Sequence, residues 1–203
     1  MSEVEVATEE KSATGTSDQA HQNPSLSEPS ERVIPAEPAG SVPLADAFDF
    51  PVGGPNGEGY YVSRGFIPDV HPGEDWNGNQ GGNTDLGDPV KSIANGHVVY
   101  ADDAKKGWGN VVIVRHAYLS KEDGLKEIDS LYGLLDQIHV EPGDVVKRGQ
   151  QIGTIGRGPK NMYSAHLYFE IRKNTNILMD RPSYPKDSTH YFLPRHFIGA
   201  HRD

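Results

Sequence analysis

Hydrophobic residues beyond position 47 occur in short runs that are separated by turn-forming residues. The clearest runs are residues 89–93, 97–100, 110–114, 130–135 and 165–172. The turns are marked by Asn95-Gly96, by residues 106–109 and by residues 141–144. Short apolar runs between Gly, Pro, Asn and Asp are typical of β-strands. No run sustains a helical period, although Leu119 to Ile128 has room for a turn or two of helix. The pattern predicts a mainly β domain built on an antiparallel sheet or sandwich.

The run at residues 165–172 alternates strictly between apolar and polar side chains. Successive side chains of a strand point to opposite faces of the sheet. One face then carries Leu167, Phe169 and Ile171, and we expect it to be buried. The other face carries His166, Tyr168 and Glu170, which predicts either a solvated surface or the floor of a groove. The last apolar run, residues 191–198, is expected to pack back onto the domain.

Residues 1–46 have a different composition, dominated by Ser, Thr, Glu, Pro and Ala. They carry nine acidic and two basic residues, whereas residues 47–203 carry twenty acidic and seventeen basic ones. Such a stretch buries too little apolar surface to offset its ordering entropy. We therefore predict a disordered acidic tail at 1–46 and a folded domain at 47–203, with most of the net charge of −10 in the tail.

Composition also excludes several classes of site. The chain has no cysteine, which excludes disulfides and thiolate metal ligands. The chain has no cluster of Lys and Arg of the kind that predicts a nucleic-acid partner. No apolar run approaches the roughly 18 residues of a membrane span. The acidic start lacks the basic-then-apolar pattern of a secretory signal. Either the chain stays in the cytoplasm or a leader has been removed from it.

One short segment carries candidate metal ligands. His71 and Asp75 are four residues apart across the Pro72-Gly73 bend, so an imidazole nitrogen and a carboxylate oxygen can reach one point. Both are acceptable ligands for zinc. Taken alone, the spacing favours an ordinary surface loop.

Four sequence blocks, in this order, resemble the LytM/lysostaphin family of peptidoglycan endopeptidases. They are His71-x-x-x-Asp75 with Trp76-Asn77-Gly78; residues 96–99 with 107–116; the Tyr132 block with 145–153; and residues 166–170. The resemblance runs from about Phe48 to Arg172. It implies a β-rich zinc-hydrolase fold, the LytM-type duplicated hybrid motif, with an open groove.

The resemblance also implies roles for single residues. Members of this family hold zinc with a His and an Asp, here His71 and Asp75, and with the second His of a His-x-His pair. That third ligand position is Tyr168 in this chain. The first His of the pair, here His166, acts as a catalytic base, and the other catalytic histidine position is occupied by Leu134.

Two of these five positions therefore lack the expected histidine. Tyrosine binds a metal only as phenolate, which is costly at neutral pH because the phenol pKa is near ~10. Leu134 can neither accept a proton nor stabilise an oxyanion, and losing one such stabiliser costs a factor of about 10²–10³ in rate. We expect zinc to be weakly bound or absent, and the domain to bind peptidoglycan peptides or a cell-wall enzyme without catalysis. The residues expected to line the binding groove are Trp76, Asn77, Trp108, Tyr163 and Glu170.

One alternative function stays open, and a second is set aside. An active zinc endopeptidase with a rearranged ligand set is the alternative, with His166, His139 or His116 as substitute groups. Residues 140–150 also resemble the turn pattern of biotinyl and lipoyl carriers, but the chain lacks the modifiable lysine between small or Met residues that carriers need. The family resemblance favours the cell envelope or secretion as the location.

Overall fold

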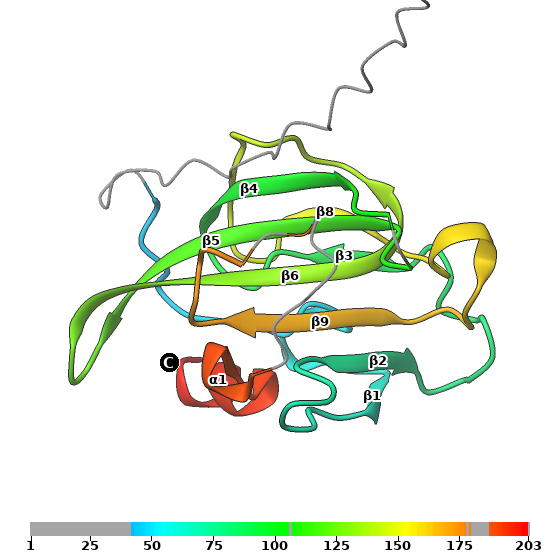
Figure 1. Cartoon of the computed structure of the whole chain (residues 1–203), viewed down its shortest axis with the longest axis horizontal. Helices are drawn as coiled ribbons and strands as arrows, with labels where there is room; N and C mark the ends of the chain where they lie inside the picture. Colours follow the sequence, from blue (N-terminus) through cyan, green and yellow to red (C-terminus); the bar gives the residue numbers. More distant parts are fainter. Residues whose placement is uncertain (1–41, 106, 178, 180–186, 203) are drawn as a thin grey trace, which may run out of the picture. The chain divides into compact units, whose positions relative to one another are not determined.

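The computed structural model describes residues 42–105, 107–177, 179 and 187–202. Within these residues the protein is mainly β, as predicted, and its strands form one antiparallel, ten-stranded sheet (Figure 1). The strands are β1 (Tyr60–Arg64), β2 (Glu74–Gly78), β3 (Pro89–Lys91), β4 (Gly96–Asp103), β5 (Asn110–Ser120), β6 (Gly124–Ile138), β7 (Val145–Val146), β8 (Gln151–Ile155), β9 (Leu167–Arg172) and β10 (Tyr191–Phe192). The order along the sheet is β1-β2-β9-β6-β5-β4-β7, with β8 beside β6 and β3 and with β10 beside β9.

Helical segments in the described residues are short. They are the 3₁₀ turns η1 (Gly54–Asn56), η2 (Pro159–Asn161) and η3 (Ser188–His190), and the helix α1 (Pro194–Ala200). Phe197 and Ile198 of α1 are buried in the main core, and β10 pairs with β9. The prediction that residues 191–198 pack back onto the domain is thus confirmed. Over the described part of the chain, none of the helices has the length and apolarity to cross a membrane.

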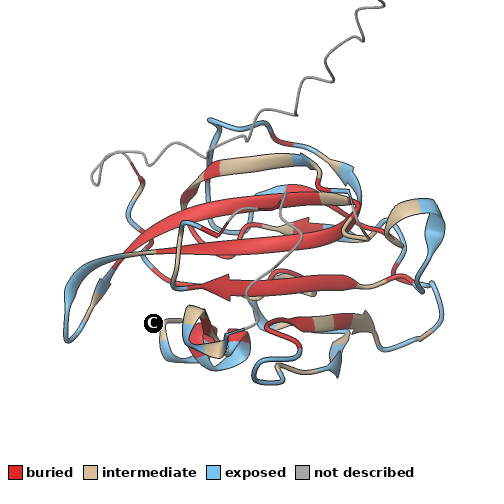
Figure 2. Cartoon of the chain, viewed as in Figure 1, coloured by how far each residue is buried: buried red, intermediate tan, exposed pale blue. Residues whose placement is uncertain are grey.

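The long hairpin β5–β6 forms the centre of the sheet, and Figure 2 shows that both strands are buried along most of their length. Strand pairing continues to Ser120 opposite Gly124. The helical turn expected between Leu119 and Ile128 is therefore wrong. Asp123-Gly124 closes the hairpin instead, with Gly124 at φ 73°, a left-handed conformation that glycine adopts without steric cost.

Strand β9 lies between β2 and β6 and is buried on both of its faces. Leu167, Phe169 and Ile171 are 0% exposed in the main core, which confirms the predicted apolar face. The polar face is not solvated, since Glu170 and Arg172 are also 0% exposed. Glu170 and Arg172 are thus part of the interior, whereas Tyr168 and His166 line a groove.

The chain already contacts the sheet a few residues before position 47. The backbone N–H of Ala45 donates to the carbonyl of Ala117 at 2.7 Å, and Val42 and Ala45 are buried. Residues 1–41 of the predicted tail lie outside the described residues.

Candidate functional site

A groove of about 510 Å³ brings together the residues singled out by the resemblance. Its lining residues are Arg64, Val70, His71, Pro72, Asp75, Gly107, Trp108, Leu134, Tyr163, His166 and Tyr168. Asp75 on β2 and Tyr168 on β9 are direct cross-strand partners, and Gly133 of β6 stands opposite Tyr168. Asp75 and Tyr168 therefore share a face, because cross-strand partners point the same way, and Leu134, next to Gly133, also lines the groove.

Asp75 lies between the two histidines of the groove. Its Oδ1 is 3.3 Å from Nε2 of His71 and 3.9 Å from Nε2 of His166. The Nδ1–H of His71 donates to the carbonyl of Gly65 at 3.0 Å, which turns Nε2 toward Asp75. Burial lowers the pKa of His71, but its hydrogen bonds to Asp75 and to the Gly65 carbonyl outweigh this, and the net pKa is raised above its ordinary value.

The spacing of these groups can be compared with a tetrahedral zinc centre. With metal–ligand distances of about 2.0–2.2 Å, two ligand atoms lie roughly 3.3–3.5 Å apart. His71 and Asp75 match this spacing, whereas His166 is further away from Asp75. Within the described residues, no group of three or more His, Cys, Asp or Glu is placed to hold a metal ion.

The hydroxyl of Tyr168, at the third ligand position, is committed to a different partner. It donates to Oε1 of Glu170 at 2.6 Å, and Nε of Arg172 donates to Oε2 of the same carboxylate at 2.8 Å. A Cβ added at Gly73 would lie 2.9 Å from the Tyr168 hydroxyl oxygen, so this oxygen is tucked against the backbone of residue 73. The ring itself packs edge-on against His71 and Trp108 and forms the floor of the groove.

Leu134 reaches the groove because strand β6 bulges at this point. Asn110 pairs with Leu135 and Val112 with Tyr132, so Gly133 and Leu134 together stand opposite one residue of β5. Leu134 has φ 64°, and its N–H donates to the carbonyl of Trp108 at 3.1 Å. A leucine in this left-handed region costs about 1–2 kcal/mol relative to a right-handed conformation. The bulge that presents a side chain to the site is thus maintained against a backbone penalty.

Three residues predicted to line the groove do not do so. Trp76 is 4% exposed in the main core, where it packs against Phe50, so the prediction for it is wrong. Asn77 uses its side-chain N–H to hold the carbonyl of Ala165 at 3.0 Å and is a structural residue. Glu170 is buried beneath Tyr168. Trp108 and Tyr163 do line the groove.

Of the three histidines considered as substitutes, His166 lies in the groove, whereas His116 and His139 do not. His116 is 0% exposed between the Asn95 carbonyl, at 2.8 Å, and the Ser130 hydroxyl, at 2.7 Å. Burial lowers its pKa to about 4. His139 is exposed, and its ring contacts the side chain of Gln137. Both histidines therefore have local structural partners away from the candidate site.

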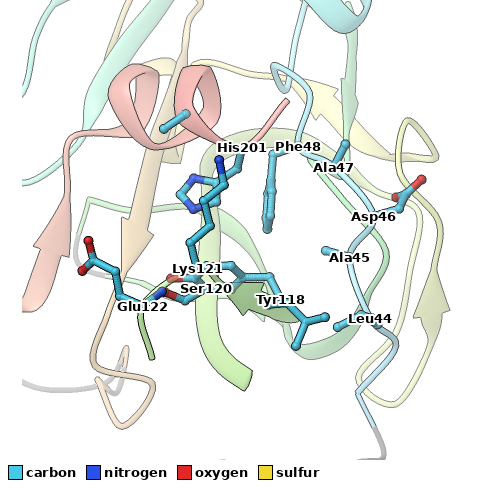
Figure 3. Close-up of a pocket in the computed structure, with 12 residues that line it drawn as sticks. Leu44, Ala45, Asp46, Ala47, Phe48, Tyr118, Ser120, Lys121, Glu122 and His201 are labelled. Atoms are coloured by element: carbon cyan, nitrogen blue, oxygen red, sulfur yellow. The ribbon is translucent and has the colours of Figure 1, made fainter. Parts of the chain in front are cut away.

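A second and slightly larger hollow, of about 590 Å³, lies between residues 44–48, the end of β5 with residues 121–122, and the end of α1 (Figure 3). Aromatic rings of Phe48, Tyr118 and His201 pack edge-to-face at its base. It contains none of the residues of the resemblance. Size alone therefore does not identify the candidate site, and the metal-ligand and catalytic positions implied by the resemblance line the smaller groove.

Comparison with known proteins assigns the chain to a family. The model of Peptidase family M23 matches residues 69–179, more than half of the chain. The chain belongs to this family, and the predicted LytM-type membership and fold are confirmed.

Individual relatives are similar over parts of their length. Lipoprotein NlpD of Yersinia enterocolitica is 40% identical over 99 residues, covering 47% of this chain and 92% of that relative. Murein hydrolase activator NlpD of Escherichia coli strain K12 is 34% identical over 118 residues, covering 54% of this chain and 28% of that relative. The structure of a zinc containing peptidase from Vibrio cholerae is 26% identical with a TM-score of 0.51, covering 70% of this chain and 41% of that one. The chain thus spans less than half the length of the last two.

Proposed function

We propose that this chain is a non-catalytic M23 domain that acts in cell-wall remodelling, and that its groove binds a peptide segment of a murein hydrolase. The observation that supports this most strongly is the hydrogen bond from the Tyr168 hydroxyl to the buried carboxylate of Glu170. The side chain at the third ligand position is thereby part of the protein interior rather than of a metal centre.

The residues present fit a catalytic zinc only in part. When bound in such a site, zinc supplies an acidified water molecule for hydrolysis. His71 and Asp75 would hold it on one side. For Tyr168 to complete the set, its phenol would have to lose its proton, at a cost set by a pKa near ~10, and to leave Glu170. At the second catalytic position Leu134 offers no group that accepts or donates a proton.

The groove keeps features that suit peptide binding. Leu134, Trp108 and Tyr163 give it apolar walls, and Val70 at its rim is 52% exposed. Exposed apolar side chains gathered around a hollow are typical of sites for protein partners. Relatives bearing the same domain are named murein hydrolase activators or lipoproteins, which supports an enzyme partner and a location in the cell envelope.

Two other functions have specific support. The resemblance to peptidoglycan endopeptidases supports direct binding of peptidoglycan peptides in the same groove. The 3.3 Å spacing of His71 and Asp75 supports an active zinc endopeptidase in which His166 moves in as the third ligand. In that arrangement His166 would no longer be free to act as a base.

Dye release from labelled murein sacculi distinguishes these functions. We expect no release by the chain alone, and a faster release when it is added to a murein hydrolase of the kind that its relatives activate. Tyr163→Ala should weaken this stimulation at least tenfold, as expected for a large aromatic side chain in the wall of a binding groove, and Val70→Ser at the rim should weaken it less. Tyr61→Ala is the matched control, because Tyr61 is 47% exposed and lies outside the groove.

The outcome identifies the function directly. Stimulation that survives both groove variants contradicts the proposal. Binding to sacculi without any effect on the hydrolase favours the peptidoglycan-binding function. Release by the chain alone, abolished by His71→Ala, favours the peptidase.

A further inference from the structure

The loop from Asn79 to Asp88, between β2 and β3, contains a buried carboxylate with an unpaired oxygen. Asp85 is 3% exposed, and its Oδ2 accepts the backbone N–H of Gly78 at 2.9 Å. Its Oδ1 is fully buried and has no hydrogen-bond partner among the described residues. Leaving a carboxylate oxygen unpaired in the interior is costly, and buried polar atoms almost always have a partner. Asp85 Oδ1 therefore points to a missing ligand.

A second carboxylate and a phenol belong to the same region of the fold as Asp85. Tyr60 of β1 is the cross-strand partner of Gly78, so the side-chain directions of these two residues share a face. A Cβ on Gly78 would lie 3.2 Å from Cβ of Asp85, which places Asp85 over Gly78 and next to Tyr60. The Tyr60 hydroxyl donates to Oδ2 of Asp88 at 2.5 Å. Asp88 thus binds the Tyr60 hydroxyl directly, and the charge of Asp85 also acts on it.

The negative charge of this cluster has no compensating cation in the described residues. Neither Asp85 nor Asp88 forms an ion pair with a Lys, Arg or His of the described part of the chain. Burial raises the pKa of Tyr60, and the hydrogen bond and charges of the two carboxylates raise it further. The local field thus favours a positive charge at this position.

We propose that Asp85 Oδ1, the Asp88 carboxylate and the Tyr60 hydroxyl oxygen form part of a divalent-cation site of the calcium class. All three groups are hard oxygen donors, which Ca²⁺ prefers, and Ca²⁺ completes an irregular set of six to eight ligands with backbone carbonyls and water. Mg²⁺ demands near-ideal octahedral geometry, which an irregular loop does not supply. Because only two carboxylates contribute charge to the site, we expect weak Ca²⁺ binding, with a Kd of about 10⁻⁴–10⁻³ M.

Such a cation acts on the wall of the groove through the same loop. Asn83 Oδ1 accepts the backbone N–H of Ala165 at 2.8 Å, and Ala165 directly precedes His166. The loop is also tied to β8, because the N–H of Gly87 donates to the carbonyl of Ile155 and the N–H of Ile155 to that of Asp88. A cation at Asp85 therefore fixes the segment that positions the start of β9, whatever the groove binds.

The experiment titrates CaCl₂ into the full chain after removal of metals, following heat by calorimetry and the melting temperature. We expect saturable binding in the stated range and a rise in Tm of about 3–6 °C at ten times the Kd. Asp85→Asn and Asp88→Asn should each weaken binding at least tenfold. Glu122→Gln, which removes one charge from the exposed end of the β5–β6 hairpin, is the matched control and should bind as the unmodified chain does.

A second measurement keeps the test decisive if a variant is unstable. In metal-free buffer Asp85→Asn should melt at or above the temperature of the unmodified chain, because it removes an unpaired buried charge. No effect of Ca²⁺ on the unmodified chain overturns the proposal, as does a Ca²⁺ effect that Asp85→Asn retains. If Asp85→Asn has a lower Tm in metal-free buffer and neither protein responds to Ca²⁺, Oδ1 bonds a buried water instead. That result also overturns the proposed cation site.

Discussion

Replacing Tyr168 by phenylalanine removes only the hydroxyl that donates to Glu170 and leaves the ring that forms the floor of the groove. Glu170 is 0% exposed and also accepts a hydrogen bond from Arg172, so water cannot replace the lost donor without rearrangement. The substitution therefore tests whether the phenol is a structural group of the interior.

The expected magnitude follows from the partners. A hydrogen bond to a charged group contributes about 1.5–3 kcal/mol. We expect Tyr168→Phe to lower the free energy of unfolding by this amount. For a domain of this size, each kcal/mol shifts Tm by about 2–4 °C, so Tm should fall by about 3–12 °C.

Denaturant unfolding at neutral pH, monitored by tryptophan fluorescence and circular dichroism, measures the change. Tyr163→Phe is the control, because Tyr163 lines the same groove, is 40% exposed and makes no side-chain hydrogen bond in the described structure. Its free energy of unfolding should stay within about 0.5 kcal/mol of the unmodified chain. If Tyr168→Phe is equally silent, the phenol is free and the reason given for the loss of the third ligand is refuted.

Three further predictions concern pH, the site and the tail. Burial lowers the pKa of His116 to about 4, so the unfolded chain binds one more proton than the folded chain between about pH 6.5 and pH 4. The free energy of unfolding should therefore be highest above pH 6.5 and fall by about 3 kcal/mol as the pH drops to 4. Unfolding curves of His116→Asn measured over the same pH range should lack this fall. The double variant Leu134→His, Tyr168→His should bind one zinc per chain and hydrolyse some cross-linked peptide, and either change alone should have much less effect. Elemental analysis measures the zinc content of the double variant. A double variant that binds no zinc would contradict the ligand assignment. Histidine also tolerates the φ of 64° at position 134 better than a bulky apolar residue does. Removing residues 1–41 should leave Tm unchanged, whereas removing residues 1–46 should lower it because Val42 and Ala45 are buried against the domain; equal Tm values of the two truncations in a thermal scan would contradict this.

Local pattern accounts for the parts of the fold that depend on strand periodicity. The alternation of Leu167, Phe169 and Ile171 predicted their burial correctly, and the spaced apolar runs predicted the antiparallel sheet. The Asp123-Gly124 pair is a turn signal in the sequence, and the expectation of a helical turn between Leu119 and Ile128 did not use it.

The remaining features depend on contacts that are distant in sequence. The burial of Glu170 requires Arg172 beside it and the carbonyl of Ile177, which accepts from Arg172 at 3.2 Å. Trp76 is in the core because Phe50, 26 positions earlier, packs against it at 5.3 Å between ring centroids. The bulge at Leu134 requires the carbonyl of Trp108 as a partner. None of these pairings has a signal in the local pattern of either partner.

We propose that the side chains at positions 134 and 168 leave no hydrolytic metal centre in the groove. The most direct test is the zinc content of the unmodified chain after mild dialysis, measured together with its hydrolysis of cross-linked murein peptides. We expect well below one zinc per chain and no hydrolysis. One tightly bound zinc per chain, with peptide cleavage that His71→Ala abolishes, would contradict it.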